Sequence, residues 1–231
     1  MRWMRGSNEI EIQHKHDYIA EREDRWRMAE KGEEPAIKEL ARRLSNILQI
    51  DEECIKYYRF DEKWFEQYPP DENNWVRGCP DYSLEINLGN NRYSYVEIKL
   101  KAVEFKKTVK GGTTKNGSIV PKYGCTSYYL DVEPVYQNIQ HFAERTKIDK
   151  VSIWLAFVRN DLSEFRLISL ACIQELIKDG WNGIALCRFG EGYGQETYLI
   201  PKDATTDISE LTREMVISAT METLVLPQSL P

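Results

Sequence analysis

Long hydrophobic runs are missing from this sequence of 231 residues, and no stretch approaches the roughly 20 apolar residues that a helix needs to cross a bilayer. The first 13 residues also lack the apolar core of a secretory signal peptide. We therefore expect no membrane insertion and a cytoplasmic location.

Cysteine is sparse, and its spacing is wrong for a metal site. The five cysteines are scattered and never form a CxxC pair: Cys54, Cys79, Cys125, Cys172 and Cys187. This pattern argues against a zinc ribbon, an iron–sulfur cluster and a disulfide framework. We expect reduced thiols that are partly buried.

Positive charge is in deficit, because the formal net charge is −6 at pH 7, which argues against a surface that is basic throughout. The distribution is uneven, however. Between Arg92 and Lys122 there are eight basic residues and two acidic ones, whereas the chain from Asp203 to its end has five acidic residues and one arginine. With 42% hydrophobic and 29% charged residues, the chain can form a real core.

The sequence predicts a helical extension over residues 1–31 and a domain over residues 32–231. Within that domain, residues 35–49 have apolar side chains at helical spacing, which predicts one buried stripe. The stripe is Ile37, Leu40, Ala41, Leu44, Ile47 and Leu48. Residues 54–60 predict a strand, and the proline-containing stretch 62–76 predicts an irregular connection.

Residues 79–101 predict a β-hairpin, in which apolar and polar residues alternate along both arms and GNN supplies the turn. Side chains two residues apart in a strand share a face. Asp81 in the first arm therefore lies on the polar face, as do Glu97 and Lys99 in the second. A hairpin centred near Asn90 places Asp81 roughly opposite Lys99.

The remaining pattern predicts further helices and strands. Residues 102–130 look like an inserted basic hairpin or loop, and 131–147 predict a helix that buries Val132, Val135, Ile139 and Phe142. The apolar run 151–158 predicts a central strand covered on both faces. Further predictions are strands at 165–170, 184–189 and 197–200 and a helix at 171–178.

The order helix, strand, strand, strand, helix, strand, with Pro80-Asp81 on the second strand and Glu97-Ile98-Lys99 on the third, resembles the PD-(D/E)xK nuclease superfamily. The resemblance covers roughly residues 33–158. It implies an α/β protein with a restriction-endonuclease-like core, in which helices flank a central mixed sheet. It also implies a hydrolase that cleaves phosphodiester bonds, with DNA as the expected substrate.

The resemblance also implies a Mg²⁺ site, for which Mn²⁺ is a substitute. Asp81, Glu97 and the backbone carbonyl of Ile98 are the expected ligands, and these hard oxygen donors are the kind that Mg²⁺ prefers. The metal would lower the pKa of a bound water, and Lys99 would position or deprotonate that water or offset developing negative charge.

Two accessory positions follow from the same family. Many members carry a glutamate on the first helix that reaches the metal, and Glu34 flanks the buried stripe there. The alternative for Glu34 is a first-turn carboxylate favoured by the helix dipole. The helix after the ExK strand often presents a glutamine, for which Gln137 is the candidate. Many relatives also form homodimers.

The basic segment over residues 99–122 adjoins the third strand. Its lysines are candidates for phosphate contacts, and Tyr123, Tyr128 and Tyr129 for stacking on bases. The alternative is a solubilising loop.

Three functions are consistent with this sequence. The first is a metal-dependent nuclease, and the second is a nucleic-acid-binding protein that keeps the fold without cleaving. The third is an unrelated protein in which Asp81, Glu97 and Lys99 form a salt-bridge ladder on a solvated sheet face.

Overall fold

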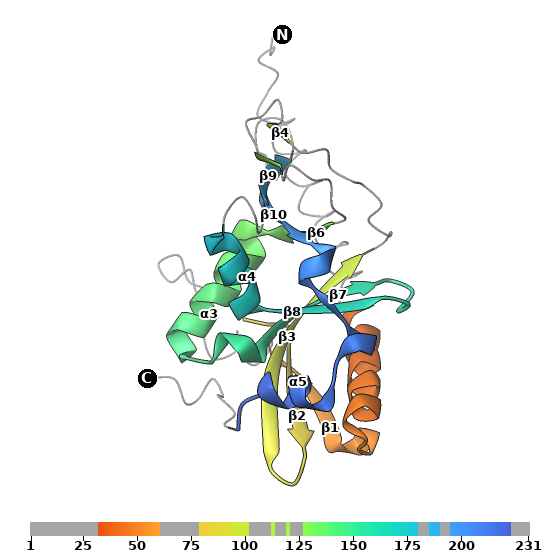
Figure 1. Ribbon diagram of the computed structural model, residues 1–231. Coiled ribbons are helices and arrows are strands. Elements are labelled where there is room, and N and C mark those ends of the chain that lie inside the picture. Colours follow the sequence, from red (N-terminus) through yellow and green to blue (C-terminus); the bar gives the residue numbers. More distant parts are fainter. Residues whose placement is uncertain are drawn as a thin grey trace, which may run out of the picture.

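The computed structural model describes residues 32–60, 79–101, 112–113, 119–120, 127–179, 185–189 and 195–222 (Figure 1). Its centre is a six-stranded sheet in the order β1-β2-β3-β7-β8-β11. The strands are β1 (Ile55–Arg59), β2 (Tyr82–Asn87), β3 (Asn91–Lys101), β7 (Ile153–Arg159), β8 (Phe165–Ser169) and β11 (Thr206–Asp207). The pair β3–β7 is parallel and the other pairs are antiparallel, so the sheet is mixed.

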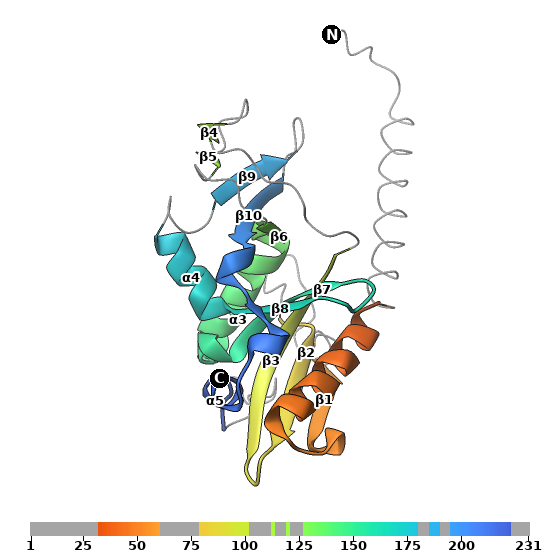
Figure 2. The same ribbon diagram turned by 45° about the vertical axis from the view of Figure 1, so that its right-hand side comes forward.

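Helices cover both faces of this sheet (Figure 2). The helix over residues 32–48 and α5 (Arg213–Ser218) pack on the face that carries Leu84, Val96 and Ala156. The opposite face carries Tyr95, Leu155 and Phe157. It packs against a π-helical turn (Val132–Gln137), α3 (Asn138–Thr146) and α4 (Leu170–Lys178). The predicted α/β class, with helices flanking a mixed sheet, is confirmed.

The helix over residues 32–48 confirms the predicted stripe, because Ile37, Leu40 and Leu44 are fully buried against the sheet. It begins earlier than expected, since Gly32 is already helical. A Cβ atom at Gly32 would lie 2.6 Å from Cδ1 of Leu100, so the glycine allows this helix to approach the end of β3 closely.

The hairpin is confirmed, but its register differs from the prediction. Tyr82 pairs with Val96 and Asn87 with Asn91, so the turn is centred on Gly89 rather than Asn90. Gly89 has a φ of 97°, a left-handed conformation that glycine adopts without steric cost. Continued by one residue, this register places Asp81 opposite Glu97 and not opposite Lys99.

The strand and helix predictions for the second half are also confirmed, with shifted ends. In β7 every residue except Arg159 is buried, as expected of a central strand. Short 3₁₀ turns occur at Glu52–Cys54, Lys150–Ser152, Lys202–Ala204 and Ile208–Glu210. No helix in the described ranges is both long and apolar enough to span a bilayer.

A second sheet, which the sequence did not predict, has the order β6-β10-β9. Its strands are β6 (Ser127–Asp131), β9 (Ala185–Phe189) and β10 (Gln195–Pro201). Two short strands, β4 (Gly112–Thr113) and β5 (Ile119–Val120), pair separately. The predicted extension over residues 1–31 lies outside the described residues, as does most of the proposed insertion over 102–130.

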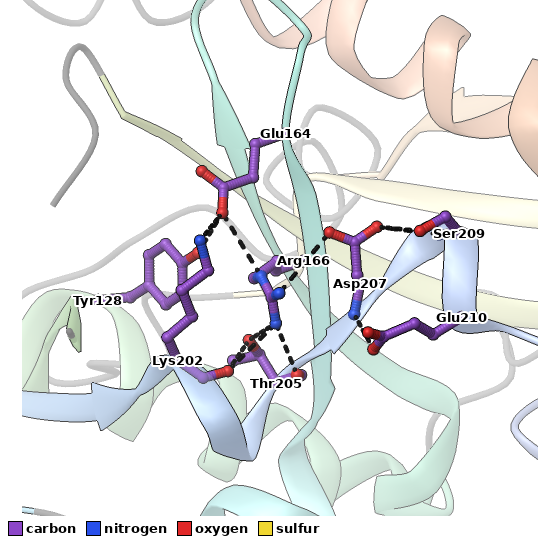
Figure 3. A network of polar contacts seen from close by, with 8 residues as sticks. All are labelled: Tyr128, Glu164, Arg166, Lys202, Thr205, Asp207, Ser209 and Glu210. Carbon is purple, nitrogen blue, oxygen red and sulfur yellow. Dashed lines mark hydrogen bonds and ion pairs between the residues drawn. The ribbon is translucent and has the colours of Figure 1, made fainter. Parts of the chain in front are cut away.

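A polar network joins the second sheet to the first (Figure 3). Glu164 precedes β8 and contacts the hydroxyl of Tyr128 on β6 at 3.1 Å and Nζ of Lys202 at 2.5 Å. Arg166 on β8 donates to the backbone carbonyls of Lys202 and Thr205, and it lies 3.7 Å from a carboxylate oxygen of Asp207. These contacts hold the end of β10 against the edge of the central sheet.

Candidate active site

Asp81 and Glu97 come together where β2 begins. The β2–β3 ladder ends with Tyr82 opposite Val96, so Asp81 and Glu97 are the next two residues facing each other. The backbone N–H of Phe60 donates to the carbonyl of Asp81 at 2.8 Å, which ties this position to the end of β1 as well. Residues directly opposite in an antiparallel pair share a face, so this register, continued by one residue, puts Asp81 and Glu97 on the same face of the sheet.

Asp81 also contacts the backbone of the residue between Glu97 and Lys99. Its Oδ2 accepts a hydrogen bond of 2.7 Å from the N–H of Ile98. The carboxylate thereby continues the β2–β3 ladder with a side chain. Because the N–H and C=O of one strand residue point to the same edge, the Ile98 carbonyl is directed toward the strand edge at which Asp81 lies.

Lys99 forms an ion pair with Glu97, with 2.5 Å between Nζ and Oε1. The side chain of Glu97 is only 8% exposed and that of Lys99 is 26% exposed, so this pair is partly buried rather than a solvated surface ladder. Burial by itself lowers the pKa of Lys99, but the Glu97 and Asp81 carboxylates outweigh it and raise this pKa above its usual range. Lys99 is therefore a cation at neutral pH.

The sequence suggested that these residues lie on a polar, solvated face of the hairpin. In the structure that face is largely buried. Tyr95 precedes Glu97 by two residues and is fully buried, in edge-to-face contact with Phe60 and Phe142. Phe157 on β7 lies beside Lys99 in register. The acidic pair thus stands at the border of an aromatic core, where partial desolvation strengthens its electrostatic interactions.

Tyr128, a candidate for stacking on bases, is instead buried in the protein. Its ring stacks on Phe157, with centroids 4.7 Å apart and an interplanar angle of 14°. Because Tyr128 is only 5% exposed, its ring cannot also stack on a nucleic-acid base. It instead packs β6 of the second sheet against β7, the strand that pairs with β3. Tyr123 and the side chain of Tyr129 lie outside the described residues.

Glu33 and Glu34 both lie in the first turn of the helix over residues 32–48, and the role of Glu34 at the metal stays a prediction. The charge of Glu33 contributes to the raised pKa of Lys99, whereas Glu34 is exposed. Glu33 also forms an ion pair of 3.3 Å with Arg59 at the end of β1. The helix begins at Gly32 rather than at Pro35, so its first turn includes Glu33 as well as Glu34.

Gln137 lies at the junction of the π-helical turn and α3, and its side chain is exposed. His141, one turn later, is exposed as well. The role of Gln137 therefore stays a prediction.

Two charged residues at the end of β1 and the start of the first helix pair with each other, and the sequence did not single them out. Glu33 was passed over in favour of its neighbour, and Arg59 was interpreted only as part of a strand. The available signal was an arginine between Tyr58 and Phe60 at the end of the strand CIKYYRF. A lone arginine at that position is common on strand ends, so the sequence alone does not single it out.

The oxygen donors of this site suit a hard divalent cation. The carboxylates of Asp81 and Glu97 and the carbonyl of Ile98 are oxygen donors, the chemistry that Mg²⁺ prefers. Within the described ranges, no group of three or more His, Cys, Asp or Glu side chains is arranged to hold an ion. Mg²⁺ commonly uses one or two carboxylates and keeps several waters, so two carboxylates are a sufficient protein contribution.

Comparison with solved structures finds a likeness over nearly the full length of the chain. No protein-family model matches the chain, and no curated protein matches it significantly. Among solved structures, D212, a nuclease from a fusselovirus, aligns over 94% of this chain and 97% of its own, with 13% identity and a TM-score of 0.42. A likeness of this size assigns neither family nor activity, so the functional argument depends on the site itself.

Proposed function

We propose that this protein is a metal-dependent nuclease of the PD-(D/E)xK type, which hydrolyses phosphodiester bonds in DNA. The observation that carries the proposal is the arrangement of Asp81, Glu97 and Lys99 at the open end of the β2–β3 ladder. Asp81 reaches across to the N–H of Ile98, inside the ExK stretch, at 2.7 Å. The strand register thus supports the proposal, although it puts Asp81 opposite Glu97 and not opposite Lys99.

The proposed cofactor is Mg²⁺, with Mn²⁺ as a substitute. Asp81 and Glu97 would hold it, together with the carbonyl of Ile98. Once bound, the ion would neutralise phosphate charge and lower the pKa of a coordinated water. Hydrolysis of an anionic phosphodiester needs this charge compensation, which explains why two carboxylates belong in a site for an anionic substrate.

Lys99 has a different proposed role, because it is a cation beside the two anions. Its ammonium group would stabilise the negative charge that develops on the phosphate and would orient the attacking water. In the described structure it neutralises part of the carboxylate charge through its 2.5 Å contact with Glu97. A rearrangement of this one ion pair would release a carboxylate oxygen of Glu97 for an incoming cation.

Two variants separate these roles. Asp81→Asn keeps size but removes a charge from the cation site, so it should weaken Mg²⁺ binding and abolish cleavage. Lys99→Met removes a cation and should leave Mg²⁺ binding intact or tighter while still abolishing cleavage. Calorimetric titration with Mg²⁺ and a DNA cleavage assay measure both quantities.

Matched controls exist elsewhere in the chain. Lys178 forms an equally short ion pair of 2.5 Å with Glu175, and Asp149 accepts a hydrogen bond from the N–H of Val151 at 3.1 Å. Lys178→Met and Asp149→Asn should leave both cation binding and cleavage unchanged. If Lys99→Met cuts as fast as the parent protein, Lys99 has no part in the mechanism. Binding of DNA without cleavage by the parent protein would instead favour a non-catalytic nucleic-acid-binding protein.

A further inference from the structure

A second cation lies near Lys99, on the strand next to β3. Arg159 is the last residue of β7, and the register pairs Lys99 with Phe157 and Lys101 with Arg159. Phe157 and Arg159 are two residues apart in one strand, so both belong to the face that carries Glu97 and Lys99. In ideal strand geometry, roughly 8 Å separate the Cα atoms of Lys99 and Arg159.

The guanidinium of Arg159 is accessible and makes one ion pair among the described residues. The Arg159 side chain is 36% exposed, and its Nε lies 3.3 Å from Oδ2 of Asp161, whose side chain is 55% exposed. Glu164 is the next residue across the β7–β8 ladder, where its carbonyl accepts from the N–H of Arg159. The Glu164 carboxylate, however, is bound by Lys202 at 2.5 Å and Arg166 at 3.4 Å. Because a guanidinium has five N–H donors, Arg159 keeps donors for a further anion.

The turn that follows Arg159 is tied to itself and to a neighbouring helix (Figure 1). The N–H of Leu162 donates to the Arg159 carbonyl at 2.8 Å, and Arg43 of the first helix donates to the Leu162 carbonyl at 2.9 Å. Oδ1 of Asp161 accepts from the N–H and the hydroxyl of Ser163 at 3.1 and 2.6 Å. Arg159 thus extends from a fixed backbone, which lowers the entropy that is lost when it binds a partner.

We propose that Arg159 binds a phosphate of the DNA strand next to the reacting phosphate at Lys99, and that Asp161 is the counter-ion that Arg159 gives up on binding. The inference rests on the proposed function, which it deepens by naming a second phosphate position. A guanidinium binds phosphate through two parallel N–H groups, whereas an ammonium group acts as a point charge. An arginine beside the reacting phosphate therefore fixes the position of the strand.

The ion pair with Asp161 predicts effects of opposite sign. Phosphate and Asp161 compete for one guanidinium, so the loss of Arg159 should weaken DNA binding and the loss of the Asp161 charge should strengthen it. If the pair only stabilised the turn, both changes would act in the same direction, because each one breaks the pair. Asp161→Asn keeps the oxygen that accepts from Ser163, so it changes the charge and preserves the turn.

Arg42 provides a matched control, because it is another exposed arginine in an ion pair. It contacts Glu39 at 2.6 Å, and its side chain is 50% exposed. The helix that carries it packs on the opposite face of the sheet, against Leu84 and Val96. Arg42→Gln removes one positive charge away from the face that carries Arg159. It should leave DNA binding and its salt dependence unchanged.

The test measures the binding of a fluorescently labelled duplex DNA oligonucleotide to the full chain, by anisotropy in EDTA at several salt concentrations. Arg159→Gln should raise Kd about 10-fold and should reduce the slope of log Kd against log salt by about 0.9. Asp161→Asn should lower Kd by about two- to fivefold. In Mg²⁺, Arg159→Gln should raise KM for DNA cleavage about 10-fold, with a smaller change in kcat. Arg159→Lys should keep the salt slope, and it replaces Arg159→Gln if that variant does not fold.

The outcomes separate this inference from the proposed function. If the parent protein neither binds nor cleaves DNA, both fail. If it binds DNA without cleaving, while Arg159→Gln and Asp161→Asn shift Kd in opposite directions, only the proposed activity fails. In a protein that cleaves DNA, an unchanged Kd and salt slope for Arg159→Gln would overturn the role of Arg159 alone. An equal loss in Arg42→Gln, or weaker binding by Asp161→Asn, would overturn it as well.

Discussion

Replacement of Glu164 by glutamine tests the network that fixes the second sheet beside the candidate site. Glu164 accepts from Tyr128 at 3.1 Å and Lys202 at 2.5 Å, and it lies 3.4 Å from Nε of Arg166 (Figure 3). Its side chain is 21% exposed and that of Arg166 is 15% exposed. Glutamine has nearly the same size but no charge, so Arg166 and Lys202 lose a shared counter-ion.

The expected cost is about 1.5–3 kcal/mol in the free energy of unfolding. The lost contacts are charge-assisted hydrogen bonds, which contribute about 1.5–3 kcal/mol when one partner is removed. The loss of one partner from a fully buried pair costs about 3–5 kcal/mol, but Glu164 is partly solvated and Asp207 still lies 3.7 Å from Arg166. The lower range therefore applies.

The cost should depend on pH in a definite direction. Burial alone raises the pKa of Glu164, but the hydrogen bonds from Lys202 and Tyr128 outweigh it and hold this pKa below its usual value of 4.5. A carboxyl group whose pKa is lower in the folded state stabilises the fold above its unfolded pKa. That stabilisation is lost as the pH falls through the folded pKa. The difference between parent and Glu164→Gln should be constant near neutral pH and should shrink below about pH 4.5.

Urea denaturation at a series of pH values measures this difference. The control is Glu175→Gln, which removes an equally short ion pair with Lys178 in which both side chains are about 70% exposed. Exposed ion pairs contribute about 0–1 kcal/mol to stability. Glu175→Gln should therefore lower the free energy of unfolding by less than Glu164→Gln does. Equal losses in the two variants, or a cost for Glu164→Gln that does not change with pH, would refute this reasoning.

Three further predictions concern stability. Leu84→Ala should lower the free energy of unfolding by about 2–5 kcal/mol in urea denaturation, because Leu84 is fully buried under the helix over residues 32–48. Tyr128→Phe should cost only about 0.5–1.5 kcal/mol by the same measurement, since the ring keeps its stack on Phe157 and loses one hydrogen bond. Thr212→Ala should cost about 1 kcal/mol, because the Thr212 hydroxyl caps α5 by accepting from the N–H of Met215; calorimetric melting should show no change if this cap is unimportant.

Local patterns in the sequence predicted most of the central sheet and its helices. The stripe of the helix over residues 32–48 and the alternation in β2 and β3 are set by neighbouring residues, and the structure buries the side chains that these patterns indicate. The hairpin register was wrong because Gly89 and Asn90 are both acceptable turn residues. That choice shifted the partner of Asp81 by two residues, from Lys99 to Glu97.

Contacts between distant segments were not predictable in this way. The second sheet pairs β6 with β10, which lie far apart in the sequence and have no shared local signal. Tyr128 was expected to stack on bases, yet its burial depends on Phe157, which belongs to another strand. Glu33 and Arg59 likewise come together only because the helix approaches β1 and the end of β3 in three dimensions.

The most direct measurement of the central claim is a cleavage assay on plasmid, single-stranded and branched DNA, with structured RNA for comparison, in Mg²⁺, in Mn²⁺ and in EDTA. The assay compares the parent protein with Glu97→Gln, which keeps the size of a side chain that is only 8% exposed. The proposal predicts that the parent protein cuts at least one DNA in Mg²⁺ or Mn²⁺, that EDTA stops the reaction, and that Glu97→Gln is inactive while still folded. Cleavage by Glu97→Gln at the parent rate, or no cleavage of any substrate by the folded parent protein, would contradict it.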